Sequence, residues 1–266
     1  MKDNKKHKKA EYGILITGLI ILLAATFVTA LCAGQYSVSV PEVTKILASR
    51  FVNVTKTWSN TAEGVVFTLR LPRIIGAVLV GSALSLSGAA YQGVFKNPLV
   101  APDLLGVSSG ACVGASVAIL LHLNSFGVQA MAFVAGILAV GLTLFIPRLI
   151  KNTNMTMLVL SGIIVKGIMD SVMGIIKYVA DPETELQSIT YWQLGSLTKV
   201  LPKDLFTVGP VIVAASVIIF LLRWRINILS LGDREAKTLG VSVTIVRNFI
   251  IILSLIHISE PTRHSL

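Results

Sequence analysis

Two charged residues inside a hydrophobic run are the first candidates for chemistry. Lys166 and Asp170 lie four positions apart in the segment 155–179, whose only other charge is Lys177 near its end. A charge at bilayer depth is costly, so such residues normally face a bundle interior or a wet pathway. Residues at i and i+4 also share one helix face, where Lys and Asp partly neutralise each other. A lining for a translocation path and a self-neutralising pair are both open interpretations.

A second candidate is the arginine pair Arg70 and Arg73, which flanks Pro72 just before an uncharged run. A guanidinium binds a carboxylate through two parallel hydrogen bonds. The pair therefore predicts an anchor for an acidic partner outside the membrane. The alternative is that both side chains extend to lipid headgroups.

The segment 229–241, LSLGDREAKTLGV, predicts a short helix with both ends marked. Asp233 is a good N-cap, Glu235 would lie in the first turn, and Gly240 suits a left-handed C-terminal residue. Ala236 and Leu239, three positions apart, would form one small apolar face. This pattern favours a docking surface for a soluble cytoplasmic partner, and an ordinary inter-helix loop is the alternative.

Catalytic and metal-binding patterns are missing from the sequence. There is no phosphate-binding glycine loop, no nucleophile elbow and no His/Cys metal spacing. Cys32 and Cys112 both lie inside apolar runs, which indicates neither a disulfide nor a metal site. We expect no enzymatic activity and no cofactor bound by this chain.

The composition indicates an all-α polytopic membrane protein. Of 266 residues, 54% are hydrophobic and 14% are charged, against about 25% charged in soluble domains. The formal net charge is +10, but the lysines and arginines adjoin hydrophobic runs, which is typical of membrane proteins and argues against nucleic-acid binding.

Membrane spans need about 20 apolar residues. The predicted spans are 12–33, 74–95, two within 104–147 that separate at 122–127, 155–179 and 205–222. A last apolar segment, 248–259, is too short to be a confident span, so we expect about six to seven helices. The first run is longer than the apolar region of a signal peptide, about 7–15 residues, so we interpret it as a retained helix.

The spacing of small residues predicts close helix packing. The glycines concerned are Gly81, Gly88, Gly106, Gly110 and Gly114. Counted with the N-terminus inside, the inner segments carry thirteen Lys and Arg and the outer segments eight. This excess predicts a cytoplasmic N-terminus and two substantial outer stretches, 34–73 and 180–204.

Several spaced motifs resemble one family, the permeases of iron-chelate and vitamin B12 ABC importers. They are LRLPR at 69–73, GSALSLSG at 81–88, Gln92, NPL at 97–99, LGVSSGA at 105–111, YWQLGSL at 191–197, LGD at 231–233 with Ala236, and LGV at 239–241. The resemblance covers roughly residues 12–255.

The resemblance implies a helical bundle of the ten-helix type II importer permease kind, in the bacterial cytoplasmic membrane. Such a permease pairs with a second copy or a close paralogue, with two cytoplasmic ATPase subunits that use ATP and Mg²⁺, and with an extracytoplasmic substrate-binding protein. The implied cargo is a ferric siderophore, with cobalamin or haem as alternatives of the same family. An ion-coupled secondary transporter is an alternative of another class.

The resemblance also assigns roles to residues. Arg70 and Arg73 match outer arginines that meet glutamates on the binding protein. The fifth span matches a helix that lines the pathway, with Asn152 and Thr153 at its inner gate. The family does not fix a charged pair at Lys166 and Asp170, so their candidacy as pathway residues, like that of Ser161, is our own interpretation. The segment matched to the coupling helix of the ATPase contains Leu231, Gly232, Asp233, Arg234, Glu235, Ala236, Leu239 and Gly240.

Three regions are expected along the chain. Residues 1–11 form a basic cytoplasmic N-terminus, and residues 12–258 form the transmembrane permease domain. That domain is expected to be incomplete, because such permeases continue after the seventh helix with a Gly-Phe-x-Gly-Leu and Pro-His segment and three more helices. The polar tail 259–266 is expected to be foreign to the family, and a non-functional fragment is a further alternative.

Overall fold

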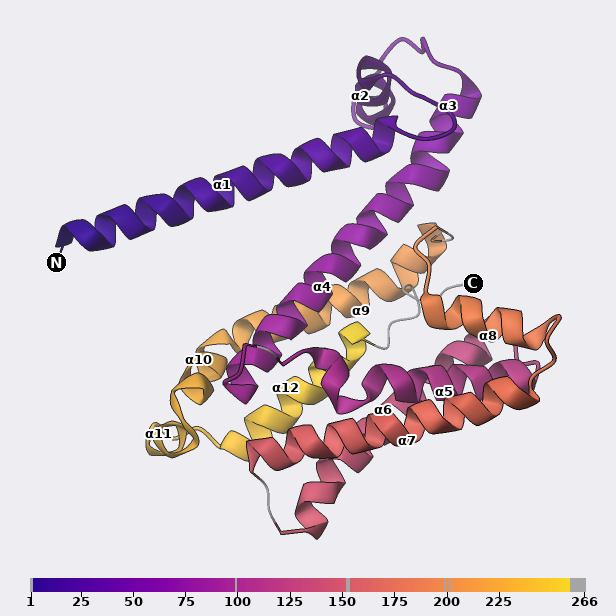
Figure 1. Cartoon of the computed structure of the whole chain (residues 1–266). Coiled ribbons are helices and arrows are strands. Elements are labelled where there is room, and N and C mark those ends of the chain that lie inside the picture. Colours follow the sequence, from indigo (N-terminus) through magenta and orange to yellow (C-terminus); the bar gives the residue numbers. More distant parts are fainter. Residues whose placement is uncertain (1, 99, 152–153, 199, 201, 259–266) are drawn as a thin grey trace. The chain divides into compact units, whose positions relative to one another are not determined.

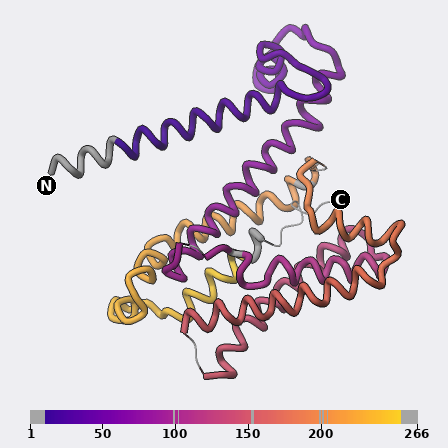
Figure 2. The backbone as a smooth tube through the Cα atoms, viewed as in Figure 1, coloured from indigo at the N-terminus to yellow at the C-terminus, as the bar shows by residue number. Residues whose placement is uncertain are grey.

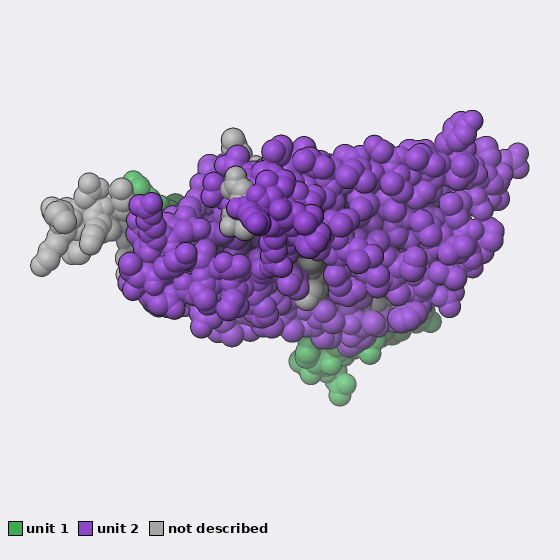
Figure 3. Space-filling model, turned by 90° about the horizontal axis from the view of Figure 1, so that it is seen from below, with its two compact units in different colours: residues 1–75 green, residues 76–266 purple. Residues whose placement is uncertain are grey.

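The computed structural model describes residues 2–98, 100–151, 154–198, 200 and 202–258, and these residues contain helices and no strand (Figure 1). The fold class predicted from the sequence is confirmed. The chain divides into two compact units, residues 1–75 and 76–266 (Figure 3). Figure 2 follows the backbone through both units.

The first unit begins with the long helix α1 (Lys2–Cys32). Its apolar segment, Glu11–Cys32, is exposed almost all round, with Ile14 and Ile21 more than 60% exposed. A helix that is apolar on every side suits a lipid environment. The C-terminal end of α1 packs with α2 (Val40–Ala48) in a small core that includes Leu31, Val43 and Ile46.

A continuous helical stretch leaves this unit, in the order α3 (Asn60–Gly64), the π-helical turn η1 (Val65–Arg70) and α4 (Leu71–Phe95). The wide turn has a local cause. Pro72 has no N–H to donate and its ring would clash with the carbonyl four residues back, and Leu71 N–H bonds Val66 O, five residues back. The helical stretch that contains the predicted span 74–95 therefore begins earlier, at Asn60.

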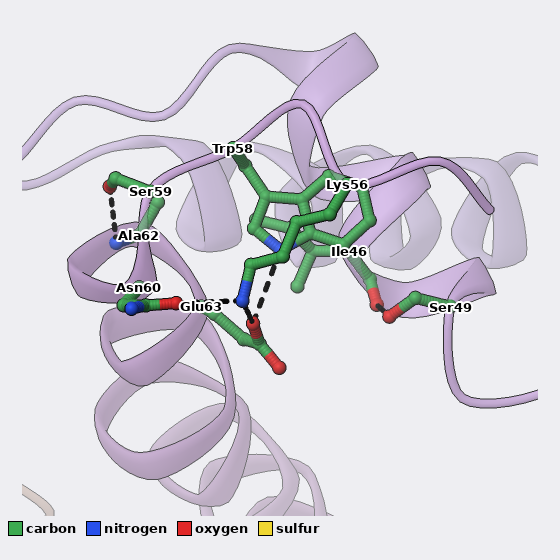
Figure 4. A network of polar contacts seen from close by, with 8 residues as sticks. All are labelled: Ile46, Ser49, Lys56, Trp58, Ser59, Asn60, Ala62 and Glu63. Atoms are coloured by element: carbon green, nitrogen blue, oxygen red, sulfur yellow. Dashed lines mark hydrogen bonds and ion pairs between the residues drawn. The ribbon is translucent and has the colours of Figure 1, made fainter.

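Polar contacts fix the loop that precedes α3 (Figure 4). Ser59 accepts a hydrogen bond from Ala62 N–H at 3.0 Å, as an N-cap does. Glu63 accepts hydrogen bonds from Lys56 Nζ at 2.7 Å and from Trp58 Nε1 at 3.3 Å. The loop is thereby tied to the start of the helical stretch.

The second unit contains the remaining helices. Their bounds are η2 (Pro102–Leu105), α5 (Val107–Leu120), α6 (Ser125–Leu149), α7 (Met155–Val179), α8 (Glu185–Leu194), α9 (Pro202–Leu221), α10 (Arg223–Leu231), α11 (Asp233–Thr238) and α12 (Val243–Ile258). One core gathers around Tyr91, Leu105, Leu229 and Ile250, and another gathers α5 with α8 around Ala115, Ala118 and Ile189.

Glycines allow α5 and α6 to touch. A Cβ at Gly110 would lie 2.5 Å from Ala139 Cβ, and one at Gly114 would lie 2.3 Å from Met131 O. Gly106, at φ +74°, adjoins Lys166 N in the same way, at 3.2 Å. The predicted close packing is confirmed at these three glycines. In the described part of the chain it is wrong at Gly81 and Gly88, where a Cβ would have no neighbouring atom within 4 Å.

Four helices of the described residues are long and apolar enough to cross a membrane: Glu11–Cys32, Asn60–Phe95, Ser125–Leu149 and Met155–Val179. A fifth span is available if Leu205–Leu221 and Arg223–Leu231, which meet at 49°, are one broken span. The segments Val107–Leu120 and Val243–Ser254 are shorter apolar helices.

One predicted span is therefore wrong in length. The first half of 104–147 forms only the 14-residue helix α5, which rises about 21 Å and falls short of about 30 Å of hydrocarbon. The reason is the break at Gly106, whose left-handed backbone separates η2 from α5. The polar tail 259–266 lies outside the described residues.

Candidate functional site

The ion pair of Lys166 joins two separate segments. Lys166 Nζ lies 2.7 Å from Asp103 Oδ2, so helix α7 is bonded to the 3-10 turn η2. The side chains are 37% and 50% exposed. Asp103 of η2 is thus the bonded partner of Lys166, in addition to Asp170 one turn along the same helix, and partial neutralisation of Lys166 by Asp170 stays an open interpretation.

Backbone contacts hold η2 against its neighbours on both sides of Asp103. Thr143 of α6 donates its hydroxyl to Leu105 O at 3.0 Å, in a fully buried position. A Cβ at Gly162 of α7 would lie 2.2 Å from Leu104 O. The turn is thus wedged between α6 and α7, which fixes Asp103 opposite Lys166.

Of the other predicted pathway residues, the structure describes Ser161 and Asp170, and neither is hydrogen-bonded to the Lys166–Asp103 pair. Ser161 is fully buried and donates its hydroxyl to Met157 O, one turn earlier in the same helix. Asp170 is exposed one turn beyond Lys166. Asn152 and Thr153 lie outside the described residues. The pathway role of these residues stays a prediction.

Arg70 binds the backbone where helix α1 ends. Its Nη1 donates to Leu31 O at 2.7 Å and to Cys32 O at 3.2 Å, and its Nη2 donates to Tyr36 O. A cation at a helix C-terminus satisfies the last carbonyls and matches the helix dipole. Gly34, at φ +151°, lies beneath the guanidinium, where a Cβ would be 2.5 Å from Nη2. Arg70 therefore has a capping role that the sequence did not reveal.

Arg73 is the less engaged arginine of the pair. Its Nε is buried without a hydrogen-bond partner in the described part of the chain. Both arginines line a cavity of about 470 Å³ with Gly34, Tyr36 and Leu69 among its walls. A docking role outside the membrane stays a prediction for both residues, and Arg73 is the better placed of the two.

Asp233 lies at a three-way ionic junction. Its carboxylate accepts hydrogen bonds from Lys96 Nζ at 2.9 Å and from Arg247 Nη2 at 2.9 and 3.0 Å. These contacts join the end of α4, the start of α11 and helix α12. The N-cap prediction for Asp233 is wrong, because Gly232 occupies that position and the carboxylate is turned to the two cations.

The electrostatics of this junction favour the ionised carboxylate. Burial raises the pKa of Asp233, and the hydrogen bonds from Lys96 and Arg247 lower it by more, so that the pKa lies below its ordinary value. Arg247 itself is almost fully buried. A buried guanidinium needs a counter-charge, which Asp233 supplies.

The predicted C-terminal cap of α11 is confirmed. Gly240 has φ +77°, its N–H donates to Lys237 O at 3.0 Å, and Val241 N–H donates to Ala236 O at 2.9 Å. These two bonds form a Schellman motif. The expected apolar face is wrong in part, because Ala236 is buried in the core while Leu239 is exposed.

The outer surface of the predicted coupling segment is mixed in character. Leu231 and Leu239 are 67% and 56% exposed, and Arg234 and Glu235 are exposed between them. A Cβ at Gly232, which has φ +152°, would fall 1.8 Å from Glu235 Oε2, so the carboxylate folds over the glycine. Two exposed leucines around charged residues suit contact with a partner, and the role stays a prediction.

Three charged residues were missed in the sequence. Asp103 had a signal, since it is an acid between two long apolar runs. Lys96 and Arg247 had none, because their partner is 137 and 14 positions away. In the described ranges no group of three or more His, Cys, Asp or Glu residues could hold a metal ion.

Comparisons with known proteins agree on one family. Residues 21–259 match the FecCD transport family. The chain is 35% identical over 244 residues to the molybdate import system permease protein MolB of Haemophilus influenzae, covering 91% of this chain and 72% of that protein. It is 38% identical over 188 residues to a probable iron chelatin transport system permease protein of Helicobacter pylori, covering 71% of this chain and 56% of that protein.

A solved structure has the same fold. It is a metal-chelate type ABC transporter in an inward-facing conformation, 32% identical, with a TM-score of 0.79, and the match covers 93% of this chain and 74% of that one. The chain thus spans between about half and three quarters of the proteins it matches. Its helices and the match across residues 21–259 show that the chain belongs to the FecCD transport family.

Proposed function

We propose that this chain is the membrane-spanning permease of an ATP-driven importer that carries a ferric siderophore into the cytoplasm. The observation that carries the proposal is the FecCD match over residues 21–259, together with several helices apolar enough to cross a membrane. The chain itself binds no cofactor in this scheme. A second permease, two cytoplasmic ATPase subunits and an extracytoplasmic binding protein complete the importer.

Molybdate is a second candidate cargo. It is favoured by the relative named for molybdate, which matches 91% of this chain, whereas the relative named for iron chelatin matches 71%. Cobalamin and haem are further alternatives. We therefore propose to measure uptake of radioactive iron as a ferric siderophore and of radioactive molybdate in cells that lack their own importers for both.

The uptake experiment co-expresses the chain with its ATPase and binding protein. Siderophore-dependent iron uptake is expected, and it should be lost when the ATPase carries an inactive nucleotide site. Uptake of molybdate alone would assign the second cargo. Uptake that persists without the ATPase and collapses with an uncoupler would instead support an ion-coupled transporter and contradict the proposal.

The coupling segment can be tested without touching the Asp233 junction. The double variant Arg234→Glu with Glu235→Lys changes two exposed residues of α11 and keeps the net charge. We expect it to lose co-purification of the ATPase. The matched control is Lys45→Glu with Glu42→Lys on α2. Retention of the ATPase by the α11 variant would show that this segment does not couple.

The docking role is tested best at Arg73, because Arg70 also holds the end of α1. Arg73→Glu should weaken association with the binding protein and reduce its salt dependence, since charge pairs at an interface are screened by ions. Arg50→Glu, which changes an exposed arginine before α4, is the control. Equal affinities of the wild type and Arg73→Glu would exclude the docking role.

A further inference from the structure

A cavity beside the Asp233 junction is not explained by the proposed transport role. It has a volume of about 260 Å³ and is lined by the end of α6, the start of α7, helix α11 and the start of α12. All its walls belong to the second unit.

The polar lining of this cavity is dominated by cations. Arg148, Lys237 and Arg247 line it, with Asp233 as the single acid. Asp233 is bonded to two cations, Lys96 and Arg247, so its single negative charge is already neutralised. Among the described residues neither Arg148 nor Lys237 has an ion-pair partner. The cavity therefore carries an excess of positive charge.

The backbone of two helices adds to this charge. Met155, the first residue of α7, and Val243 and Thr244, the first residues of α12, are part of the lining. The N–H groups of a first helical turn have no acceptor within their helix, and the helix dipole places partial positive charge there. Two helix starts converging on one cavity form a surface that attracts oxygen anions.

Arg247 gives an independent indication of a ligand. Its side chain is 11% exposed and lines the cavity. Only Nη2 of its guanidinium is hydrogen-bonded within the described part of the chain, and Nε is buried with no partner. Asp233 supplies the counter-charge of this guanidinium, and the pair leaves some of its N–H donors without an acceptor.

We propose that this cavity binds a phosphate group. A tetrahedral oxyanion accepts hydrogen bonds from guanidinium, ammonium, hydroxyl and backbone N–H donors, all of which are present here. The group can come from an anionic phospholipid, because the cavity lies where the long apolar helices α6 and α7 end and begin, or from free phosphate. This inference does not depend on the cargo or on the ATPase.

The test uses the whole chain purified in detergent. In one arm, native mass spectrometry measures retention of short-chain phosphatidic acid, with diacylglycerol of the same chains as control. In the other arm, binding of radioactive inorganic phosphate is measured at constant ionic strength. Retention of phosphatidic acid that phosphate cannot displace supports a lipid source, and binding of phosphate by itself supports the free anion.

The variants remove cations that stand outside the Asp233 junction. Arg148→Gln with Lys237→Gln should weaken binding by about tenfold or more, because each loses a charged donor. Arg148→Lys with Lys237→Arg should keep binding, which separates loss of charge from misfolding. Arg225→Gln with Lys203→Gln, two exposed cations away from the cavity, should bind like the wild type.

The proposal is overturned if neither probe binds, or if the wild type and the Arg148→Gln, Lys237→Gln variant bind equally. It is also overturned if the wild type binds no oxyanion while retention of an ATPase subunit depends on Arg148 and Lys237. The cavity would then be a contact for a protein partner.

Discussion

Arg70 ties its own turn to a helix end that lies nearly forty positions earlier in the chain. Because its guanidinium donates to three carbonyls at once, a lysine ammonium with the same charge cannot replace it. Arg70→Lys is expected to loosen the end of α1, with a loss of about 1–3 kcal/mol from charged hydrogen bonds. Hydrogen–deuterium exchange of residues 30–36 should rise. Arg73→Lys is the control, and equal exchange in both variants would argue against the cap.

Asp233 should make the stability of the protein depend on pH. Its pKa is lowered in the folded state, so its stabilising contribution is fully present above the pKa of the unfolded chain and is lost as the pH falls through the folded pKa. Asp233→Asn should cost about 1–2 kcal/mol at neutral pH, a low value because the side chain is 48% exposed.

Thermal unfolding in detergent across a pH series checks this dependence. The difference in Tm between the wild type and Asp233→Asn should shrink as the pH is lowered into the acid range. Glu235→Gln, an exposed acid on the same helix, serves as the reference variant. A difference that is constant at every pH would mean that the carboxylate charge does not matter.

At the scale of elements, the α5–α6 contact depends on the absence of side chains. Gly114→Ala would drive a Cβ into the backbone carbonyl of Met131, and the helices must separate to admit it. A loss of about 1–3 kcal/mol is typical of such overpacking. Gly81→Ala, which meets open space, should be near neutral in this chain. Similar Tm values for the two variants would contradict the packing.

The Lys166–Asp103 pair joins η2 to α7, and a charge exchange tests it. Lys166→Asp and Asp103→Lys should each place two like charges side by side and lower the yield of folded protein. The double variant should recover much of that loss, because it restores an opposite pair. Folded yield is measured by size-exclusion chromatography. A double variant no better than the single ones would show that the pair is not coupled.

Helix positions were predictable wherever an apolar run was uninterrupted. The predicted span 155–179 has the same limits as α7, because Asn154 and Ala180 stand outside the helix on either side. Elsewhere local backbone chemistry prevailed over hydropathy. The helical stretch continues from the π turn Val65–Arg70 into α4, whose second residue is Pro72. Gly106 divides one predicted span into a short turn and a short helix.

The candidate site was less predictable than the helices, for a physical reason. Residue type shows that Asp233 or Arg70 needs a partner, but not which one. The partner of Arg70 is backbone, which carries no sequence signal, and Lys96 reaches Asp233 only after seven further helices have been placed. Such contacts exist only in the folded chain.

At the scale of the whole molecule, the exposed surface is largely apolar along the long helices. Helix α1 alone exposes Ile14, Leu15, Ile16, Leu19, Ile20, Ile21, Leu22 and Leu23 by more than half of each side chain. The chain should therefore stay in the membrane pellet after alkaline carbonate washing, since lipid replaces water around these side chains. Release into the supernatant would contradict an integral membrane protein.

The contact between Gly162 and Leu104 has a consequence for mutational tolerance. Helix α7 contributes the bare backbone of Gly162 to this contact, and η2 contributes the carbonyl of Leu104. In a scan of all substitutions, position 162 should accept almost nothing, whereas the half-buried side chain at 104 should accept several apolar residues. The position least tolerant of substitution for the turn that carries Asp103 is thus expected to be Gly162, some sixty positions away, which has no side chain.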